Sequence, residues 1–237
     1  VLSDHNKTLF TYFKQLFAQV SNPPLDYIRE ELVTSLDSHI GRKRNLLTEG
    51  PEHCRQLQLD SPILSDAERT ALQNADSKGI QSCTVDTTFG KTTALEQAIE
   101  RVRRDARQAI DDGCELLFLS DRAAGADRIP LPSLLTVGAV HHDLIHSGHS
   151  PETTSSSGDH GSPSSGRRTH AALILESGQP CAVHHFCTLI GYGADAVHPY
   201  LAYATVRDLA ARSDEVSDHT TAIERYIGSI EQGLLKV

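Results

Sequence analysis

The sequence contains no methionine and no tryptophan among its 237 residues, and it begins at Val1. A gene product of this size without methionine is unusual. Helices are predicted almost from the first residue and almost to Val237, and no polar tail follows the last one. We therefore expect the chain to be a piece excised from a longer polypeptide, with cuts at both ends.

Long apolar runs and an excess of positive charge are lacking as well. No apolar stretch approaches the roughly 20 residues that span a bilayer, and no basic-then-apolar leader opens the chain. The formal net charge is -9, and two short basic clusters, at residues 42–44 and 167–168, are expected to be solvated loops. Nucleic acid and membranes are therefore not expected as partners, and a cytoplasmic location is expected.

Cysteines are few and not paired in spacing. Five stand at positions 54, 83, 114, 181 and 187, an odd number with no C-x-x-C pair. A zinc ribbon, an iron–sulfur cluster or a disulfide framework needs closer, paired spacing. We expect buried, reduced thiols instead, and no metal or other cofactor bound by this chain.

The first third of the chain is predicted to be mainly helical. Its apolar spacing predicts helices over residues 5–21 and 26–36 and a connecting stretch over 41–61. Ser65, followed three positions later by Glu68, is the capping-box signature of another short helix. Residues 1–78 are thus predicted to be an N-terminal helical part.

From about residue 79 the pattern alternates between strand and helix four times. Strands are predicted over residues 80–89, 114–121, 170–177 and 194–199. Helices are predicted over residues 92–112, 133–148, 182–193 and 200–211. Such alternation is typical of a parallel βα arrangement with right-handed crossovers. Residues 79–237 are therefore predicted to be the α/β, βα-repeat part of what we expect to be one structural domain.

Two segments of this part carry more detailed predictions. The long helix should bury Leu95 and the apolar residues that follow it at helical spacing, pair Glu100 with Arg104, and stop at Gly113. The stretch 147–169 is rich in Ser and Gly and nearly free of apolar residues. It is expected to be a flexible surface loop, because it cannot bury enough surface to offset its ordering entropy.

Histidines are the first candidates for chemistry. His142 and His146 lie four apart on one helix face and could hold a metal with a third ligand. The glutamate of an H-E-x-x-H helix is missing, however, so packing or solvent exposure is the favoured interpretation. His184 and His185 are adjacent and should lie on different helix faces.

Gly191 and Gly193 are the second candidates, since glycine backbone can wrap a phosphate. Here the G-x-G motif ends a helix and enters a strand, whereas phosphate-binding glycines leave a strand and open a helix. A helix-ending left-handed turn followed by close helix–strand packing is the favoured explanation of both glycines.

The third candidate is the loop that follows the strand 114–121. Functional residues of βα-barrels lie at the carboxyl ends of strands, and Ser120, Asp121 and Arg122 occupy that position. Asp127 and Arg128 of the same loop could pair with them. A structural network in the loop and an interdomain or channel contact are both open, and no catalytic residue is assigned.

Four motifs together resemble the central domain in the large subunit of glutamate synthase. They are "TYFKQLFAQVSNPPLDYIREE" from Thr11, "LFLSDR" from Leu117, "PSLLTVGAVHHDLI" from Pro132 and "VHHFCTLIGYGADAVHPYLA" from Val183. The similarity runs nearly end to end, and several long motifs in one order are not expected by chance.

The resemblance implies a rudimentary or partial (βα) barrel related to FMN-binding TIM barrels, preceded by the N-terminal helical segment. It implies a position between a glutaminase domain, which releases ammonia from glutamine, and an FMN barrel with an iron–sulfur cluster, which reduces the imine formed from 2-oxoglutarate. The chain would join these two partner domains of the same polypeptide and help form an internal ammonia channel. A glutamate synthase small subunit is a further candidate partner. The alternative is an independent flavin- or metal-dependent βα-barrel enzyme.

The sequence departs from the family pattern at three places. Asp143 stands where another histidine is frequent, and His198 stands where asparagine is usual before "PYLA". The stretch 147–169 is longer than the resemblance leads us to expect. None of these departures falls on a presumed catalytic position.

Overall fold

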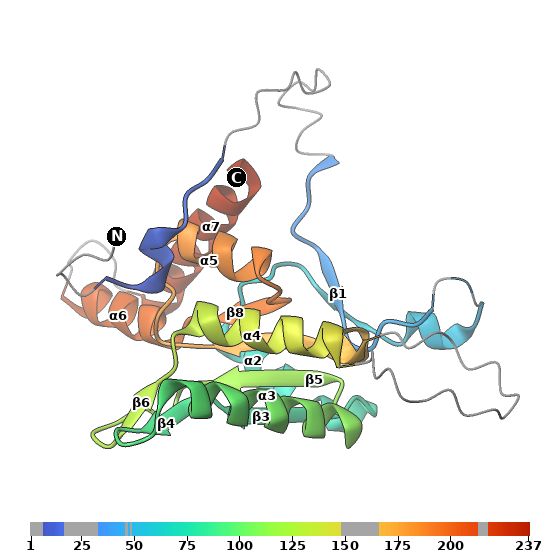
Figure 1. The fold of residues 1–237 in the computed structure, drawn as a ribbon. Coiled ribbons are helices and arrows are strands. Elements are labelled where there is room, and N and C mark those ends of the chain that lie inside the picture. Colours follow the sequence, from blue (N-terminus) through green and yellow to red (C-terminus); the bar gives the residue numbers. More distant parts are fainter. Residues whose placement is uncertain (1–6, 17–32, 46, 48, 148–165, 213–217) are drawn as a thin grey trace, which may run out of the picture.

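The computed structural model describes residues 7–16, 33–45, 47, 49–147, 166–212 and 218–237 (Figure 1). Most of the predicted flexible loop 147–169 lies outside these residues. Among the described residues, no helix is long and apolar enough to cross a membrane.

A four-stranded parallel sheet forms the centre of this α/β fold. Its strands are β3 (Ser82–Asp86), β5 (Leu116–Ser120), β7 (Ala172–Glu176) and β8 (Ala196–His198), in the order β3-β5-β7-β8. Every residue of β5, β7 and β8 is buried, as expected for strands covered on both faces. A helix follows each strand along the chain, so the fourfold alternation predicted from the sequence is confirmed.

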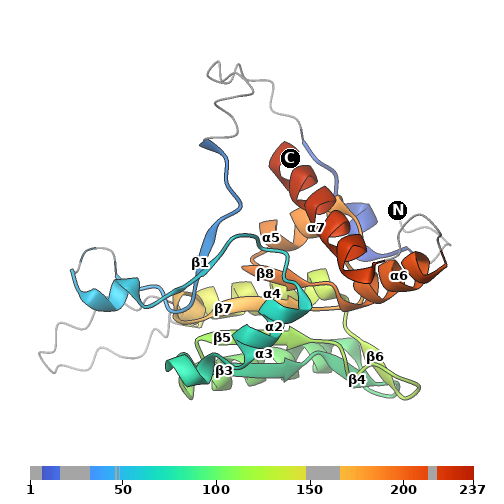
Figure 2. The same cartoon turned by 180° about the vertical axis from the view of Figure 1, so that it is seen from behind.

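Alternate side chains of the strands feed two separate hydrophobic cores. Leu117 and Leu119 of β5 belong to the core shared with helices of one face. These helices are α3 (Leu95–Asp111), α4 (Ser133–His146) and α5 (Val183–Gly191). Leu116 and Phe118 point to the other core, which includes residues of α2 (Asp66–Gln73). Accordingly, α3 and α4 lie in front of the sheet in Figure 1, and α2 lies in front of it in Figure 2.

Two further helices pack beside the end of β8. Helix α6 (Tyr200–Ala211) follows β8 directly, and α7 (His219–Lys236) lies against α5 and α6. The fully buried Tyr203 of α6 donates its hydroxyl hydrogen to the carbonyl oxygen of Leu64 at 2.8 Å. This bond ties α6 to the segment that enters α2.

The helix predicted over residues 5–21 is wrong for the residues that the structure describes. They form only a short 3-10 turn, η1 (Leu9–Tyr12), and Phe13 after it is extended. Phe10 of this turn is 1% exposed and stacks on the ring of His185, with 4.4 Å between the ring centroids. The docking of the Phe10 side chain against α5 therefore fixes the local backbone. The spacing of apolar residues along the sequence cannot predict such a contact, because the partner is distant in sequence.

A short antiparallel hairpin occupies the region predicted to be helix and connection. β1 (Ser38–Ile40) pairs with β2 (Leu57–Leu59), and the 3-10 turn η2 (Pro51–Cys54) lies between them. Of the predicted helix 26–36, Val33 is helical and residues 34–36 are not; the rest lies outside the described residues. Strands of three residues show too few alternations to be predicted, although Ile40 and Leu59 are buried in the α2 core.

The short helix that was predicted to begin after the cap residue Ser65 is confirmed as α2. The Ser65 hydroxyl accepts the Glu68 amide hydrogen at 3.3 Å, and the Glu68 carboxylate accepts the Ser65 amide hydrogen at 2.8 Å, which completes the capping box. Just before it, Ile63 forms a parallel bridge with Val197 of β8. The capping box and this bridge place α2 beside the carboxyl end of β8.

The ion pairs of α3 differ from the prediction, because they are organised by Asp143 of α4. Glu100 contacts Arg103 at 2.8 Å and Arg107 at 3.4 Å, and the predicted pair with Arg104 is absent. The buried Asp143 carboxylate lies 2.5 Å from Arg103 and 2.7 Å from Arg107. Both arginines therefore face α4, and the departure at position 143 proves to be an ion-pair bridge between α3 and α4.

The prediction for the carboxyl end of α3 is confirmed, and the prediction for its first residue is wrong. Gly113 has a φ of +101° directly after the helix, which confirms it as the helix stop. Leu95 was predicted to be buried but is 39% exposed. It is the first residue of α3, where the helix has just left the loop.

A second small ribbon lies beyond the tips of β3 and β5. β4 (Thr88–Gly90) pairs antiparallel with β6 (Arg128–Pro130), and β6 was not predicted from the sequence.

All five cysteines are free, but only Cys114 is fully buried; Cys54 and Cys181 are exposed. The expectation of buried thiols is therefore wrong for these two.

Candidate functional site

Four polar side chains end the four parallel strands. Asp86, Ser120, Glu176 and His198 are the last residues of β3, β5, β7 and β8, and each is the register partner of the next. Because the carboxyl ends of parallel strands meet at one edge, these residues form a row, here called the strand-tip row. This edge is where βα-barrels place functional residues, and it contains the predicted Ser120.

Glu176 lies in the middle of the strand-tip row and is 1% exposed. Its carboxylate accepts hydrogen bonds from Ser120 Oγ at 2.6 Å and Arg122 Nε at 2.5 Å, and Arg69 Nε of α2 lies 2.9 Å away. Burial opposes ionisation, but these hydrogen bonds and the two positive charges outweigh it, so the pKa of Glu176 is lowered. Glu176 is therefore an ionised carboxylate whose partners come from the protein itself.

Asp121 is a second buried carboxylate beside the row, with 3% exposure. It accepts hydrogen bonds from Ser177 Oγ at 2.6 Å, from the Gly178 amide at 3.1 Å and from the Tyr200 hydroxyl. Burial is the largest influence and raises the pKa of Asp121, the Glu176 charge adds to it, and the hydrogen bonds oppose it only in part. These contacts join the tips of β5 and β7 to the start of α6.

Arg122 is the one member of the predicted trio with a substantially exposed side chain, at 46%. Its Nε is held by Glu176, and its guanidinium lies over the Tyr200 ring at 4.6 Å from the centroid. Ser120 and Asp121 are buried and occupied by their own hydrogen bonds. The structure thus brings all three predicted residues together but gives Arg122 a different position from the other two.

His198 ends the row and is fully buried. Its Nε2 lies 2.9 Å from Asp66 Oδ1 of α2, and Nδ1 lies 3.7 Å from Glu176 Oε1, too far for a hydrogen bond. Asp66 is in turn paired with Arg207 of α6. Burial lowers the pKa of His198 despite the neighbouring carboxylates, so the ring is neutral at pH 7 and donates from Nε2 to Asp66.

Acidification from pH 7 to pH 5 is expected to destabilise the protein, in part through His198. Its folded-state pKa is lowered from the ordinary value of 6.5, so the unfolded chain binds a proton first, and stability is lost as pH falls below that value. His198→Asn should lose less stability than the native chain over this interval. Urea unfolding at both pH values measures the two losses. His141, His170 and His185, whose pKa values are also lowered by burial, remain in both proteins, so equal losses would contradict this role of His198.

The predicted pairing of Asp127 and Arg128 with residues 120–122 is wrong for Arg128. Its Nε donates to Thr88 Oγ1 at 2.7 Å, and its guanidinium pairs with Asp86. The reason is the ribbon of β4 and β6, which places Arg128 opposite Gly90 and turns its side chain toward the tip of β3.

Of the candidate histidines, His142 and His146 are exposed, and His184 and His185 pack against η1. The rings of His142 and His146 are 6.4 Å apart, and His146 Nδ1 lies 2.6 Å from the carbonyl oxygen of His142. His184 and His185 were expected on different helix faces, yet both contact Phe10: His184 Nε2 lies 3.1 Å from its carbonyl oxygen, and His185 stacks on its ring. In the described parts of the chain, no group of three or more His, Cys, Asp or Glu side chains could hold a metal ion.

The two candidate glycines have different roles. Gly193 has a φ of +110°, as the predicted helix-ending turn requires, but the ring that a Cβ there would overlap belongs to His141 of helix α4 and not to a strand. Gly191 is the last residue of α5, has no positive φ, and would meet nothing within 4 Å. The predicted turn is therefore confirmed for Gly193, and the prediction is wrong for Gly191.

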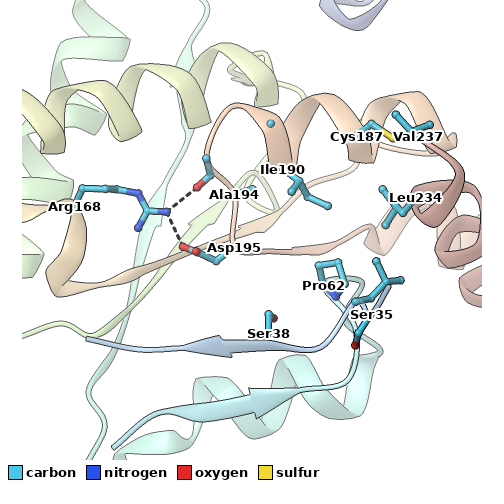
Figure 3. A pocket seen from close by; sticks show the side chains of 13 residues that line it. Ser35, Ser38, Pro62, Arg168, Cys187, Ile190, Ala194, Asp195, Leu234 and Val237 are labelled. Carbon is cyan, nitrogen blue, oxygen red and sulfur yellow. Dashed lines mark hydrogen bonds and ion pairs between the residues drawn. The ribbon is translucent and has the colours of Figure 1, made fainter. Parts of the chain in front are cut away.

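A pocket of about 580 Å³ lies near the other end of β8, away from the strand tips (Figure 3). Cys187, Ile190 and Leu234 form part of its apolar wall. At its polar end, Arg168 donates to Asp195 Oδ2 at 2.7 Å and to the Gly193 carbonyl oxygen at 2.9 Å. The pocket is thus mainly apolar, and Arg168, the one cation among its described lining residues, is occupied.

The basic cluster 167–168 is not the solvated loop expected from the sequence. Arg168 is largely buried and holds the turn between α5 and β8 through its bonds to Gly193 and Asp195. Arg167 forms a two-bond ion pair with Asp111 of α3. Both side chains therefore connect helices and strands that are distant in sequence.

The carboxylates of the strand-tip row would repel the phosphate of FMN, and the Nε atoms of Arg69 and Arg122 already lie against Glu176. What the arrangement does is mechanical: through Arg69, Tyr200 and the pair Asp66–His198, it fastens α2 and α6 to the sheet.

Glu176, His198 and Arg69 were not predicted as site residues. A glutamate at the end of an apolar strand, and a histidine before proline at the end of the next, were visible signals. Their partners were not, because Arg69 precedes Glu176 by 107 residues and Asp66 precedes His198 by 132.

Comparison with known proteins places the whole chain in one family. Residues 1–237 match the glutamate synthase central domain. The chain is 39% identical to the glutamate synthase [NADPH] large chain of Bacillus subtilis (strain 168) over 237 residues, and 40% identical to the glutamate synthase [NADH] of Schizosaccharomyces pombe over 243 residues. It is 37% identical to the chloroplastic ferredoxin-dependent glutamate synthase of Oryza sativa subsp. japonica over 252 residues.

All of this chain is covered in each comparison, but it spans only 14%, 11% and 14% of these three relatives. The names of these three relatives give different electron donors, and their sequence identities to this chain are nearly equal. The comparison therefore does not indicate which electron donor is used. The alternative of an independent flavin- or metal-dependent barrel enzyme is not favoured by these matches.

Proposed function

Because the chain belongs to the glutamate synthase central domain family, we propose that it connects a glutaminase domain to an FMN-binding synthase domain of the same polypeptide. Its role is to hold the two domains at a fixed distance and to form part of the wall of the ammonia channel between them. FMN and an iron–sulfur cluster belong to the synthase domain in this proposal. A partial barrel related to the FMN barrel, a cytoplasmic location and contact with a small subunit are further parts of it.

The observation that carries the proposal is the mutual pairing at the strand tips. Where a barrel enzyme would present groups to a substrate, Glu176 and Asp121 accept hydrogen bonds from neighbouring side chains. Charge at this edge is used to hold α2, the sheet and α6 together, which makes the unit stiff. A stiff unit suits a spacer, since ammonia that escapes into water is diluted and protonated and so loses its nucleophilicity.

Arg122 is the residue we propose for contact with a neighbouring domain. Its Nε is fixed by the buried Glu176 and its flat face by Tyr200, so the outer edge of the guanidinium is held in one orientation while nearly half of the side chain is exposed. A held guanidinium fits a carboxylate of a partner surface. Ser120 and Asp121 act behind it as support.

The test uses the complete glutamate synthase that carries this domain. Arg122→Ala should lower glutamate formation from glutamine at least about threefold, because misplacing the two sites costs rate, while glutamine hydrolysis and glutamate formation from added ammonia continue. Arg104→Ala, at a more exposed arginine of α3, is the control and should change none of the three rates. Unchanged glutamine-dependent synthesis in Arg122→Ala, or an equal fall of all three rates, would contradict the proposed contact.

A further inference from the structure

Cys181 and His185 form a thiol–imidazole pair at the start of α5. Cys181 is exposed, and its Sγ lies 3.7 Å from His185 Nδ1. The backbone amide of Cys181 donates to the same nitrogen at 3.2 Å. This bond assigns Nδ1 as the acceptor of the neutral ring, with the ring proton on Nε2. The single lone pair of Nδ1, which the Cys181 amide approaches, is therefore also the proton acceptor for the thiol.

The imidazole ring is held in place and kept neutral. It stacks on Phe10 of η1 with an interplanar angle of 17°, where η1 lies beside α5 (Figure 1). Burial, followed by the charge of His184, lowers the pKa of His185, so the ring is unprotonated at pH 7. A fixed neutral imidazole beside a thiol is the arrangement by which proteins activate cysteine nucleophiles.

The other cysteines lack this combination of exposure and a base. Burial raises the pKa of Cys114 and of Cys187, which disfavours their thiolates. Cys54 is exposed, but among the described residues no imidazole nitrogen lies within hydrogen-bonding distance of its sulfur. Cys54 is therefore a matched internal control for an exposed thiol without a base.

We propose that Cys181 is a modification site, a reactive thiol that exchanges with small disulfides with His185 as its base. The thiol proton passes to Nδ1, and the thiolate sulfur attacks one sulfur of the disulfide. A new S–S bond forms at Cys181 as the S–S bond of the small disulfide breaks, and the departing thiolate takes the proton from the imidazolium. One thiol is consumed and one released, so no other oxidant is needed.

The experiment measures mixed-disulfide formation with oxidised glutathione on the 237-residue chain at pH 7, by mass spectrometry of the separate cysteine peptides. Cys181 should react at least about tenfold faster than Cys54, as expected for a positioned base. Towards acid pH the Cys181 rate should fall additionally as His185 is protonated. Equal rates for Cys181 and Cys54 in the native chain would overturn the proposal.

Two variants separate the base from the packing around it. His185→Phe keeps a ring on Phe10 and should bring the Cys181 rate to within about twofold of Cys54, whereas His184→Gln should leave it within about twofold of native. If the buried Cys114 of His185→Phe reacts with oxidised glutathione under native conditions, this variant has lost its fold. His185→Gln then takes its place, because it keeps an acceptor for the Cys181 amide without a base. An unchanged Cys181 rate in the folded variant would refute the role of His185.

Discussion

Glu176→Gln is expected to lower the free energy of unfolding by about 3 kcal/mol, the loss typical when one partner of a buried ion pair is removed. The amide keeps the shape of the side chain but leaves Arg69 and Arg122 without a negative partner at a site that is 1% exposed. The exposed part of Arg122 can regain water, which keeps the loss from being larger. Urea unfolding of the native chain and the variant at pH 7 measures it.

Glu115→Gln is the matched control for this prediction. Glu115 also pairs with an arginine, at 3.0 Å from Arg55, but the Glu115 side chain is 13% exposed against 1% for Glu176, and nearly half of the Arg55 side chain is exposed. Exposed pairs of this kind contribute little, so we expect a loss below about 1 kcal/mol. Equal losses in the two variants would mean that the strand-tip row is not a principal fastening of the fold.

Gly193→Ala is expected to destabilise the protein by about 3 kcal/mol, through a left-handed backbone at a residue with a side chain and overlap with a fixed ring. Gly193 lies two residues after the end of α5 with a φ of +110°; its amide donates to the Ile190 carbonyl oxygen, and the next amide donates to that of Leu189. The His141 ring that a Cβ would overlap is held by Arg168 Nε at 2.9 Å. It therefore cannot move aside without breaking that bond.

Gly191→Ala provides the control two residues earlier. Gly191 is the last residue of α5, and a Cβ there meets nothing within 4 Å. Alanine is the better helix former by about 1 kcal/mol, so the variant should be as stable as the native chain or slightly more so. If thermal unfolding showed both alanine variants equally destabilised, the positive φ and the His141 contact would not be the cause at position 193.

The sequence was sufficient for the elements whose signals are local. Continuous apolar runs located β5 and β7, because strands covered on both faces need apolar residues on both. The capping box at Ser65 located the start of α2, since both of its hydrogen bonds lie within four residues.

Features that depend on distant partners could not be predicted. Phe10 takes its conformation from His185, and Arg168 is buried because Asp195 and the Gly193 carbonyl oxygen receive it. The same holds for the candidate site. Position alone indicated Ser120, Asp121 and Arg122, but their roles were set by Glu176, which no local pattern connects to them.

The two departures from the family pattern that the structure describes illustrate the same point. Asp143 could be expected only to weaken a motif, yet it is the buried anion that receives Arg103 and Arg107. His198 replaces the usual small residue before "PYLA", and its ring reaches Asp66 of α2. Each substitution adds a contact between elements, which is consistent with a domain whose task is to be stiff.

The central claim is that the groups at the strand tips bind one another and leave no place for a cofactor. Titration of the purified chain into FMN, followed by flavin fluorescence, tests this most directly. The account predicts that the fluorescence stays unchanged up to an excess of chain over flavin, and that the chain carries no flavin when purified. Stoichiometric quenching, or a flavin that copurifies with the chain, would contradict it.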